Sequence, residues 1–292
     1  MSQQARTWKV GRPLDLGEPC LLGIVNCTPD SFSDGGRWRD AQHAVDGALE
    51  MLCGGVGVDV GGESTRPGST RVDAQLQIER VIPVIEGIRR QSQQLITVDT
   101  TLAKVAEAAL DAGADAINDV AAGTEDEAMF ALAAQRECGL ILMHRHCLPS
   151  QDRYSTSYEQ APMQGDVVTT VIDWLEQRAL AAEAAGVDRQ AICIDPGLGF
   201  GKTVAQNWAL IAASGRFVAT GRPVLAAASR KSFIGAVAGG GPPAELDAAS
   251  ATVTVMQYML GLRLFRVHAI EPHDAALHQL GAFTAVSDLP AC

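Results

Sequence analysis

Eight short apolar runs, each long enough for a buried strand, recur along this chain of 292 residues. Sequence typical of helices separates most of them, and most runs end in polar or glycine-rich sequence. The runs are 21–26, 56–61, 95–99, 116–120, 140–144, 191–195, 223–229 and 264–268. Eight parallel strands that alternate with helices over about 250 residues form a (β/α)8 barrel. The sequence therefore predicts an α/β fold, a TIM barrel in a single domain.

The predicted barrel spans 21–283, and no Pro- or Ser-rich linker divides it. Residues 1–20 are an N-terminal extension, which we expect to cap the bottom of the barrel as a strand pair or a turn. The apolar positions of this extension are Trp8, Val10, Leu14 and Leu16. Residues 284–292 are expected to form a loose tail.

The formal net charge of −11 argues against an extended nucleic-acid surface, although it leaves room for a local basic pocket. No run reaches ~20 apolar residues and the N-terminus has no apolar signal core, so we expect neither a membrane span nor secretion. The seven cysteines include no CxxC pair, and several lie in apolar runs, which is typical of reduced thiols in a cytoplasmic protein. Basic residues at run ends in an acidic chain indicate a small anionic ligand.

Charged and amide side chains stand at the ends of the apolar runs, where a barrel carries its chemistry. These residues are Asn26, Asp99, Asn118, His144, Asp195, Lys231, Arg266 and His268. Arg266 and His268 alternate on the last run, so both side chains point to one face and suit a phosphate group. Ser229, Arg230 and Lys231 place two cations beside the barrel mouth, where they need an anionic or acceptor partner.

Two glycine-containing loops follow the first two runs. The loop at 26–36 holds Phe32 and Asp34, and it is either a lid that closes over a ligand or a polar turn in which a carboxylate caps the next helix. The loop at 61–69 holds Arg66, whose planar guanidinium suits an anion but is also common in exposed loops. Gly and Ser make both loops costly to order, so we expect them to close only on ligand contacts.

Other polar positions have competing interpretations. Asp99 and Asp119 both suit a helix cap as well as a ligand contact. Asp195 is a good acceptor for a ring N–H or an amino group. The segment 196–202 resembles a phosphate loop but lacks the spacing GxxxxGK[ST], which disfavours nucleotide binding of that type. The histidines of 144–146 have no Cys or carboxylate at ligand spacing, which disfavours zinc.

Sequence blocks along nearly the whole chain resemble the signature of the dihydropteroate synthase family. In order they are IVNCTPDSFSDGG, DVGGESTRPGS, TVDTT, INDV, IDPGLGFGKT, SRKSFIG and FRVH, and they span 24–268. Members of that family are (β/α)8 barrels, usually homodimers, that join 6-hydroxymethyl-7,8-dihydropterin pyrophosphate to p-aminobenzoate and release pyrophosphate, with Mg²⁺. The resemblance implies the same fold, reaction, substrates, metal and oligomeric state here, in folate biosynthesis.

The resemblance also implies a role for each matching residue. Asp99, Asn118, Asp195 and Lys231 match the pterin-binding residues. Asn26, Arg266 and His268 match the pyrophosphate site, and Asn26 also lies where the family binds Mg²⁺. Phe32, Thr65, Arg66, Pro67 and Ser229 match the surroundings of p-aminobenzoate. The implied catalytic residues are Asp34 on the mobile first loop, Arg66, Lys231, Arg266 and His268.

The chain departs from the family pattern at positions that leave substrate affinity open. They are Cys27, the loop at 145–149, Gln206, the alanines at 226–228 and Ala269. Two other functions share the pterin pocket: a catalytically silent pterin-binding paralogue, and a methyltransferase domain that acts with a corrinoid protein. The intact TPDSFSDGG and STRPGS loops argue against the first, and the cations of SRKSFIG and FRVH argue against the second.

A late stretch of the chain suits a dimer contact. The segment 246–264 has apolar residues at Met256, Tyr258, Met259 and Leu262. The same spacing equally suits a helix packed on the barrel.

Overall fold

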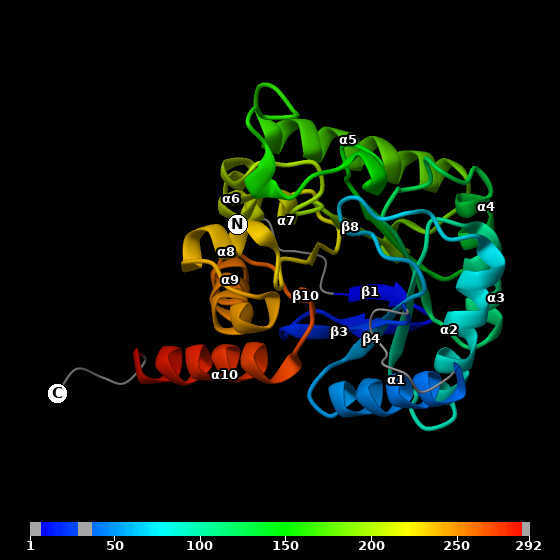
Figure 1. The fold of residues 1–292 in the computed structure, drawn as a ribbon. Helices are drawn as coiled ribbons and strands as arrows, with labels where there is room; N and C mark the ends of the chain where they lie inside the picture. The colour runs from blue at the N-terminus through cyan, green and yellow to red at the C-terminus, as the bar shows by residue number, and fades with distance from the viewer. Residues whose placement is uncertain (1–6, 29–36, 288–292) are drawn as a thin grey trace.

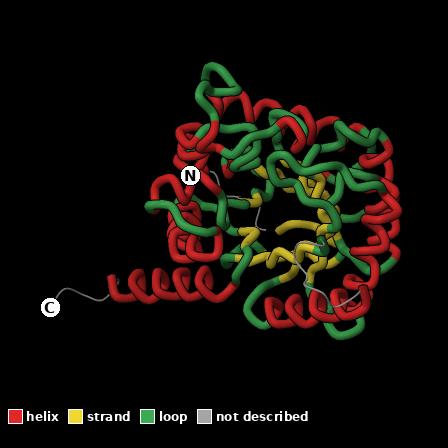
Figure 2. The backbone as a smooth tube through the Cα atoms, viewed as in Figure 1, coloured by secondary structure: helices red, strands yellow, loops and turns green. Residues whose placement is uncertain are grey.

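The structure is a computed structural model that describes residues 7–28 and 37–287. In these ranges eight parallel strands lie at the centre and helices surround them (Figures 1 and 2). The strands are β3 (Cys20–Asn26), β4 (Gly57–Gly61), β5 (Leu95–Asp99), β6 (Ala116–Asp119), β7 (Gly139–Met143), β8 (Ile192–Asp195), β9 (Leu225–Ala226) and β10 (Leu264–Val267). They pair in the order β8-β7-β6-β5-β4-β3-β10-β9, and a bridge between Ile194 and Val224 joins the two ends of the sheet. The fold is the predicted (β/α)8 barrel.

Each of these strands coincides with one of the eight predicted runs. The run at 223–229 differs most from its prediction, because only Leu225–Ala226 forms a strand. There it pairs with Leu264 and Phe265 of β10. A few residues later Arg230 adopts a left-handed backbone with φ of 57°, which is incompatible with a continuing strand.

Helices follow the barrel strands along the described chain. They are α1 (Arg37–Leu52), α2 (Ala74–Arg89), α3 (Ala103–Asp111), α4 (Ala128–Arg136), α5 (Val167–Ala184), α6 (Val204–Ala212), α7 (Ser214–Val218), α8 (Ser232–Ala238), α9 (Asp247–Met259) and α10 (Ile270–Ser287). Side-chain caps fix several starts: Asp73 accepts from Leu76 N, and Thr203 forms a capping box with Gln206. None of these helices combines the length and the hydropathy that crossing a bilayer requires.

The apolar core lies between the strands and the helices. On β4, Val58 and Val60 are fully buried and pack in one cluster with Val81 and Ile85 of α2. Because successive strand residues point to opposite faces, Asp59 between them points into the barrel. It is also fully buried. A polar residue on the inner face of a buried strand needs partners inside the barrel, and this requirement locates the site described below.

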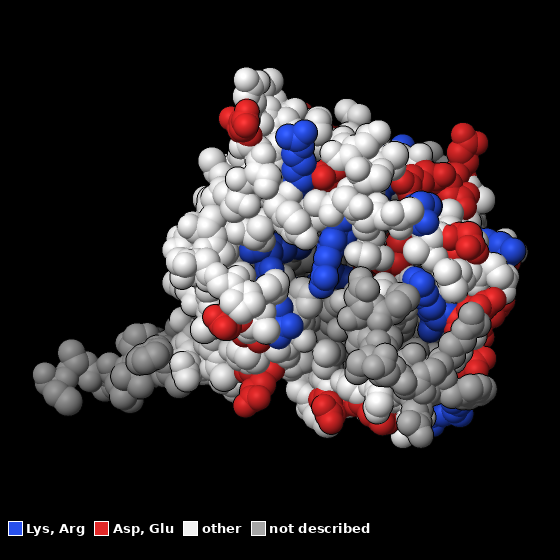
Figure 3. Space-filling view, in the orientation of Figure 1, with Lys and Arg blue, Asp and Glu red and all other residues white. Residues whose placement is uncertain are grey.

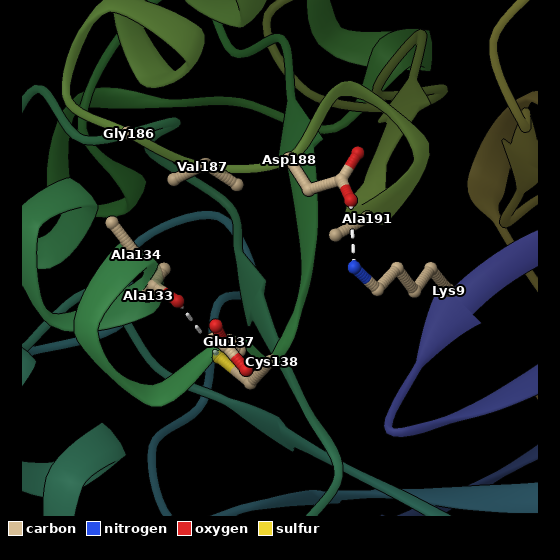
Figure 4. A pocket seen from close by; sticks show the side chains of 9 residues that line it. All are labelled: Lys9, Ala133, Ala134, Glu137, Cys138, Gly186, Val187, Asp188 and Ala191. Carbon is tan, nitrogen blue, oxygen red and sulfur yellow. Dashed lines mark hydrogen bonds and ion pairs between the residues drawn. The ribbon is translucent and has the colours of Figure 1, made fainter.

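The N-terminal extension contributes an antiparallel hairpin of β1 (Thr7–Val10) and β2 (Arg12–Asp15). Trp8 is fully buried at the start of the barrel strands, and its Nε1 donates a 2.7 Å hydrogen bond to the carbonyl of Ala191. A pocket of about 140 Å³ lies beside this hairpin, where Lys9 reaches Asp188 at 2.7 Å (Figure 4). The pocket lies before β7 and β8, at the end of the barrel opposite to the carboxyl ends of the strands.

Helix α10 packs against α9 and extends away from the barrel (Figure 1). It continues to Ser287, past Thr284, where the sequence predicts the start of a loose tail. That expectation is therefore wrong for 284–287, and 288–292 lie outside the described residues.

Candidate active site

The carboxyl ends of neighbouring strands bring three predicted polar positions, Asn26, Asp99 and Asn118, into one row. In the sheet Asn26 pairs with Gly61, Gly61 pairs with Asp99, and Asp99 pairs with Asn118. Asp195 ends β8 opposite Met143 of β7. The register therefore places these side chains at one end of the barrel, as the sequence predicts from the ends of the runs.

Asp59, which has no role in the sequence analysis, is the centre of the hydrogen bonds inside the barrel. Its Oδ1 accepts from Thr97 Oγ1, and its Oδ2 accepts from Asn118 Nδ2 at 3.0 Å. Arg266 Nε also donates to Oδ2, at 2.5 Å. The signal for Asp59 was present in the sequence: a carboxylate flanked by two valines in a strand has no solvent to face.

Arg266 joins this carboxylate to a second one. Its Nη2 donates to Asp99 Oδ2 at 2.9 Å, so one guanidinium bridges two strands. Burial raises the pKa of Asp99 to about 7. The charge of Arg266 opposes this shift, and the charge of Asp59 adds to it. The cap interpretation of Asp99 is wrong, because Thr100 and Asp126 accept the N–H groups at the start of α3 instead.

Asn118 keeps one polar atom free among the described residues. Its Nδ2 is committed to Asp59, so its Oδ1 points the other way, and this buried oxygen has no hydrogen-bond partner in the described structure. A buried acceptor without a partner costs stability unless a ligand satisfies it. Asn118 therefore presents an acceptor for a donor group of a ligand. The adjacent Asp119 instead caps a turn, accepting from Ala121 N and Gly123 N at 2.8 and 2.6 Å.

Asp195 and Lys231 also interact through their charges. Asp195 is buried and Lys231 is half-buried, and the charge of each acts on the pKa of the other. Burial raises the pKa of Asp195 and lowers that of Lys231 to about 8, and the attraction between the two partly offsets both shifts. Lys231 Nζ also donates to the carbonyl of Leu198 and lies 4.6 Å from the centre of the Phe200 ring.

The glycines after β8 allow this loop to approach its neighbours. Gly199 has φ of 84°, and a Cβ there would lie 2.9 Å from Cδ of Lys231. Gly197 has φ of 65°, and a Cβ there would lie 1.8 Å from the carbonyl oxygen of His144. Side chains at these two positions would displace the loop that contacts Lys231.

Lys202, at the end of the same loop, is fully buried and was not assigned a role from the sequence. Its Nζ donates to the carbonyls of Gly197 and Phe200 at 2.8 and 2.9 Å and lies 3.1 Å from His144 Nδ1. Burial lowers the pKa of Lys202 to about 7, and burial with the charge of Lys202 lowers that of His144 to about 2. These hydrogen bonds from Lys202 hold the loop at 196–202, which contacts Lys231, in its conformation. The described ranges contain no group of three or more His, Cys, Asp or Glu side chains placed to hold a metal ion.

Of the two cations predicted together, only Lys231 faces the site. Arg230, with its left-handed backbone, makes two hydrogen bonds of 2.6 and 2.8 Å to Asp247. Ser229 lies 3.1 Å from Nδ1 of His268 and accepts from the His268 N–H at 3.2 Å. Burial, with the charges of Arg266 and other cations, lowers the pKa of His268 to about 3, so this imidazole is neutral near pH 7.

The predicted loop residues divide between described and undescribed parts. Thr65 and Pro67 are half-buried and Arg66 is exposed, and the charge of Arg66 contributes to the lowered pKa of His268. Phe32 and Asp34 lie outside the described residues. Figure 3 shows a face hollowed near its centre, with Lys and Arg side chains around the hollow and many Asp and Glu side chains nearer the edge.

Two of the departures from the family pattern have structural explanations. Gln206 completes the capping box of α6, and its Nε2 donates to the carbonyl of Met163 at 2.8 Å. Cys27 is buried in the apolar cluster with Val25 and Val60. Both side chains therefore have capping or packing partners within the protein.

Comparison with known proteins agrees with this geometry. A family described as "Pterin binding enzyme" matches residues 22–268. Dihydropteroate synthase from Streptococcus pyogenes serotype M18 is 42% identical over 277 residues, which cover 93% of this chain and 99% of the relative. The Mycobacterium leprae enzyme of that name is 40% identical over 92% of this chain and 95% of the relative.

Solved structures give the same result. Xanthomonas albilineans dihydropteroate synthase with 4-aminobenzoic acid superposes with a TM-score of 0.87 at 38% identity, covering 98% of this chain and 100% of that one. The same enzyme in complex with 7,8-dihydropteroate gives 0.83 at 36% identity, covering 97% and 100%. Since the family model, the relatives and the barrel with its inward carboxylates and cations all agree, the chain belongs to the dihydropteroate synthase family.

Proposed function

We propose that this protein condenses 6-hydroxymethyl-7,8-dihydropterin pyrophosphate with p-aminobenzoate, giving 7,8-dihydropteroate and pyrophosphate in folate biosynthesis. The observation that carries the proposal is the free acceptor Oδ1 of Asn118, which lies in the same row as Asp99 at the carboxyl ends of the strands. A pterin edge presents several N–H donors, and carboxylates and an amide oxygen are suitable acceptors for them.

Asp99, Asn118, Asp195 and Lys231 form the proposed pterin site. The two carboxylates and the amide accept from the ring N–H and amino groups, and Lys231 donates to a ring acceptor. Asp99, Asn118 and Asp195 are buried and Lys231 is half-buried, which strengthens these hydrogen bonds because little water competes for them.

Asn26, Arg266 and His268 form the proposed pyrophosphate site. Arg266 is fixed by Asp59 and Asp99, and His268 by Ser229, so both groups are positioned before the anion arrives. A guanidinium and an imidazole on one strand suit phosphate oxygens.

The pyrophosphate site also suits Mg²⁺ in the mode that this ion prefers. Mg²⁺ is usually held by one or two protein oxygens, with substrate phosphates and water completing its shell. Asn26 at the end of β3 offers one such oxygen, and Asp34 on the first loop is proposed as another. Bound there, the ion would neutralise charge on the departing pyrophosphate.

Phe32, Thr65, Arg66, Pro67 and Ser229 form the proposed p-aminobenzoate site. Arg66 is exposed and close enough for its charge to act on His268, so it stands beside the pyrophosphate site. Its guanidinium suits the carboxylate of p-aminobenzoate.

In the proposed reaction the bond between the pterin methylene carbon and the pyrophosphate oxygen breaks, and pyrophosphate takes the electron pair. The amine nitrogen of p-aminobenzoate then bonds to that carbon and loses a proton. Arg266 and His268 stabilise the departing charge, so the reaction needs no protein nucleophile. Asp34, Arg66, Lys231, Arg266 and His268 are the proposed catalytic residues.

A homodimer through the late helices is part of the proposal. Met256 and Met259 of α9 are 42% and 70% exposed, which leaves an apolar surface available for a partner. Leu262 is buried and Tyr258 is covered by the Arg263 guanidinium at 4.3 Å, so these two positions serve the fold of one chain.

The test is release of pyrophosphate on mixing the protein with both substrates and Mg²⁺, with dihydropteroate detected by chromatography. Omission of p-aminobenzoate is the control, and should abolish product. Pterin binding without turnover would identify a silent paralogue instead. Methyl transfer from methyltetrahydrofolate would identify the methyltransferase.

A further inference from the structure

Four loops at the carboxyl ends of the strands meet at the carboxylate of Glu125. It lies after β6, and it accepts hydrogen bonds from Thr101 after β5 at 2.5 Å and from Arg71 after β4 at 2.7 Å. Its other oxygen accepts from Arg145 Nη2, on the loop after β7. The Arg145 side chain is 7% exposed and that of Glu125 16%, so water screens this pair little.

Glu125 is charged in this arrangement. Burial acts to raise its pKa, but the hydrogen bond from Thr101 and the charges of Arg145 and Arg71 hold the pKa of Glu125 below its ordinary value. A buried guanidinium such as that of Arg145 needs an anion beside it, and Glu125 supplies it. The four loops are therefore joined by charge-assisted hydrogen bonds and not only by packing.

The loop joined by Arg71 is the one that carries Arg66. At its base, Glu63 Oε1 accepts from Val72 N at 2.6 Å, and Arg80 donates to the carbonyl of Gly62 at 2.7 Å. Arg71 lies between two carboxylates, 3.5 Å from Glu63 and 2.7 Å from Glu125.

The middle of the same loop is attached to the loop that carries Arg145. Gly68 N donates to the carbonyl of Pro149 at 2.7 Å. The segment 62–73 is thus held at its base, at Arg71 and at Gly68 by contacts within the protein. This differs from the expectation that the second loop becomes ordered only through ligand contacts.

We propose that Glu125 is a positioning residue for p-aminobenzoate, which it serves by holding 62–73, and with it Arg66, in place before substrate binds; the proposal rests on the function proposed above. Arg145 belongs to the 145–149 segment, where the sequence departs from the family pattern. The arginine at this divergent position therefore supplies the cation that covers Glu125 and orients its carboxylate.

Hydrogen exchange tests the proposal without reference to activity. In the ligand-free protein, Glu125→Gln should exchange amide hydrogens of peptides within 62–73 about tenfold faster than wild type. Peptides from β5 should be unchanged. Glu127→Gln, an exposed glutamate two positions along the same loop, is the matched control and should leave 62–73 unchanged.

Kinetics supply the second measurement. Glu125→Gln should raise KM for p-aminobenzoate about tenfold and change KM for the pterin substrate by less than about twofold. Arg71→Gln should reproduce this split, whereas Arg71→Lys, which keeps the charge, should restore part of the affinity. The double variant Glu125→Gln with Arg71→Gln should be no worse than either alone, because both changes open the same contact.

Unchanged exchange and unchanged KM in Glu125→Gln would overturn the proposal. Faster exchange throughout the barrel would also overturn it, because Glu125 would then act on global stability only. If the wild type makes no dihydropteroate while exchange in 62–73 still rises, the proposed function fails and the role of Glu125 in the loop remains.

Discussion

Arg266 Nε donates a 2.5 Å hydrogen bond to the carboxylate of Asp59, and these residues stand 207 positions apart in the chain. The same carboxylate orients the amide of Asn118 at 3.0 Å. Asp59 therefore orients one residue of the proposed pyrophosphate site, Arg266, and one residue of the proposed pterin site, Asn118. Asp59 itself is fully buried.

Asp59→Asn should weaken the binding of both the dihydropterin and pyrophosphate. An amide could keep its oxygen toward Arg266 and Asn118 only with its NH2 group toward Thr97, and it would remove the negative charge that Arg266 faces in a buried site. Breaking a buried pair of this kind costs about 3–5 kcal/mol of unfolding free energy. Urea unfolding measures the loss, and calorimetry should show weaker binding of both dihydropterin and pyrophosphate. Asp173→Asn, exposed on α5, is the control. Weakening for only one ligand would contradict the shared role.

Asp195→Asn should weaken pterin binding strongly while the fold remains intact. The carboxylate accepts from pterin N–H groups in a site without bulk water, and an amide would turn a donor toward a donor. The loss should be on the order of 2–4 kcal/mol. Titration calorimetry with the dihydropterin measures it. An unchanged dissociation constant would remove Asp195 from the site.

Asp99→Asn should stabilise the protein at high pH while it weakens ligand binding. The pKa of Asp99 is raised from 3.8 to about 7, so between these values the folded protein binds more protons than the unfolded chain. Its contribution to stability is then lost as pH rises through this range. The variant lacks that loss, so its unfolding free energy relative to that of the wild type should rise between about pH 4 and pH 8. Thermal unfolding at both pH values measures the difference. A gain that does not depend on pH would contradict the raised pKa.

Pyrophosphate binding should add a proton to His268. In the free protein, burial and the charge of Arg266 lower its pKa to about 3, so it is neutral near pH 7. The anion raises that pKa, and a group whose pKa rises on binding makes affinity increase as pH falls. Calorimetry in two buffers of different ionisation enthalpy counts the protons taken up. His268→Gln should take up fewer protons than wild type. Equal uptake would mean that His268 binds as a neutral donor.

The sequence predicts the barrel well because its strands are buried on both faces. Runs such as 140–143 are apolar throughout, which helices on a barrel surface are not, and each run contains a strand. The polar ends of the runs also predict the row from Asn26 to Asn118, because the carboxyl ends of neighbouring parallel strands lie at the same end of the barrel.

The contacts within the site were not accessible from the sequence. From the sequence alone, the neighbouring residues Arg230 and Lys231 are equivalent candidates for the site. Arg230, with its left-handed backbone, bonds to Asp247, whereas Lys231 donates to the Leu198 carbonyl. Asp59 could have been found from its place between two valines of a strand, whereas Lys202 lies in the loop after β8, where no local pattern says which side chain is buried. The link from Arg71 to Glu125 spans 54 positions and forms only when β4, β5 and β6 lie side by side in the sheet.

The pairing of β10 with β3 also constrains how the protein folds during its synthesis on the ribosome. The strand that completes the barrel is β10, and with it comes the guanidinium that two buried carboxylates require. Until β10 has left the exit tunnel, Asp59 and Asp99 have no cation between them, and enclosing their side chains costs free energy. A nascent chain that ends before residue 264 should therefore remain open and accessible to chaperones, and ligand affinity should arise in a single step once β10 has been released.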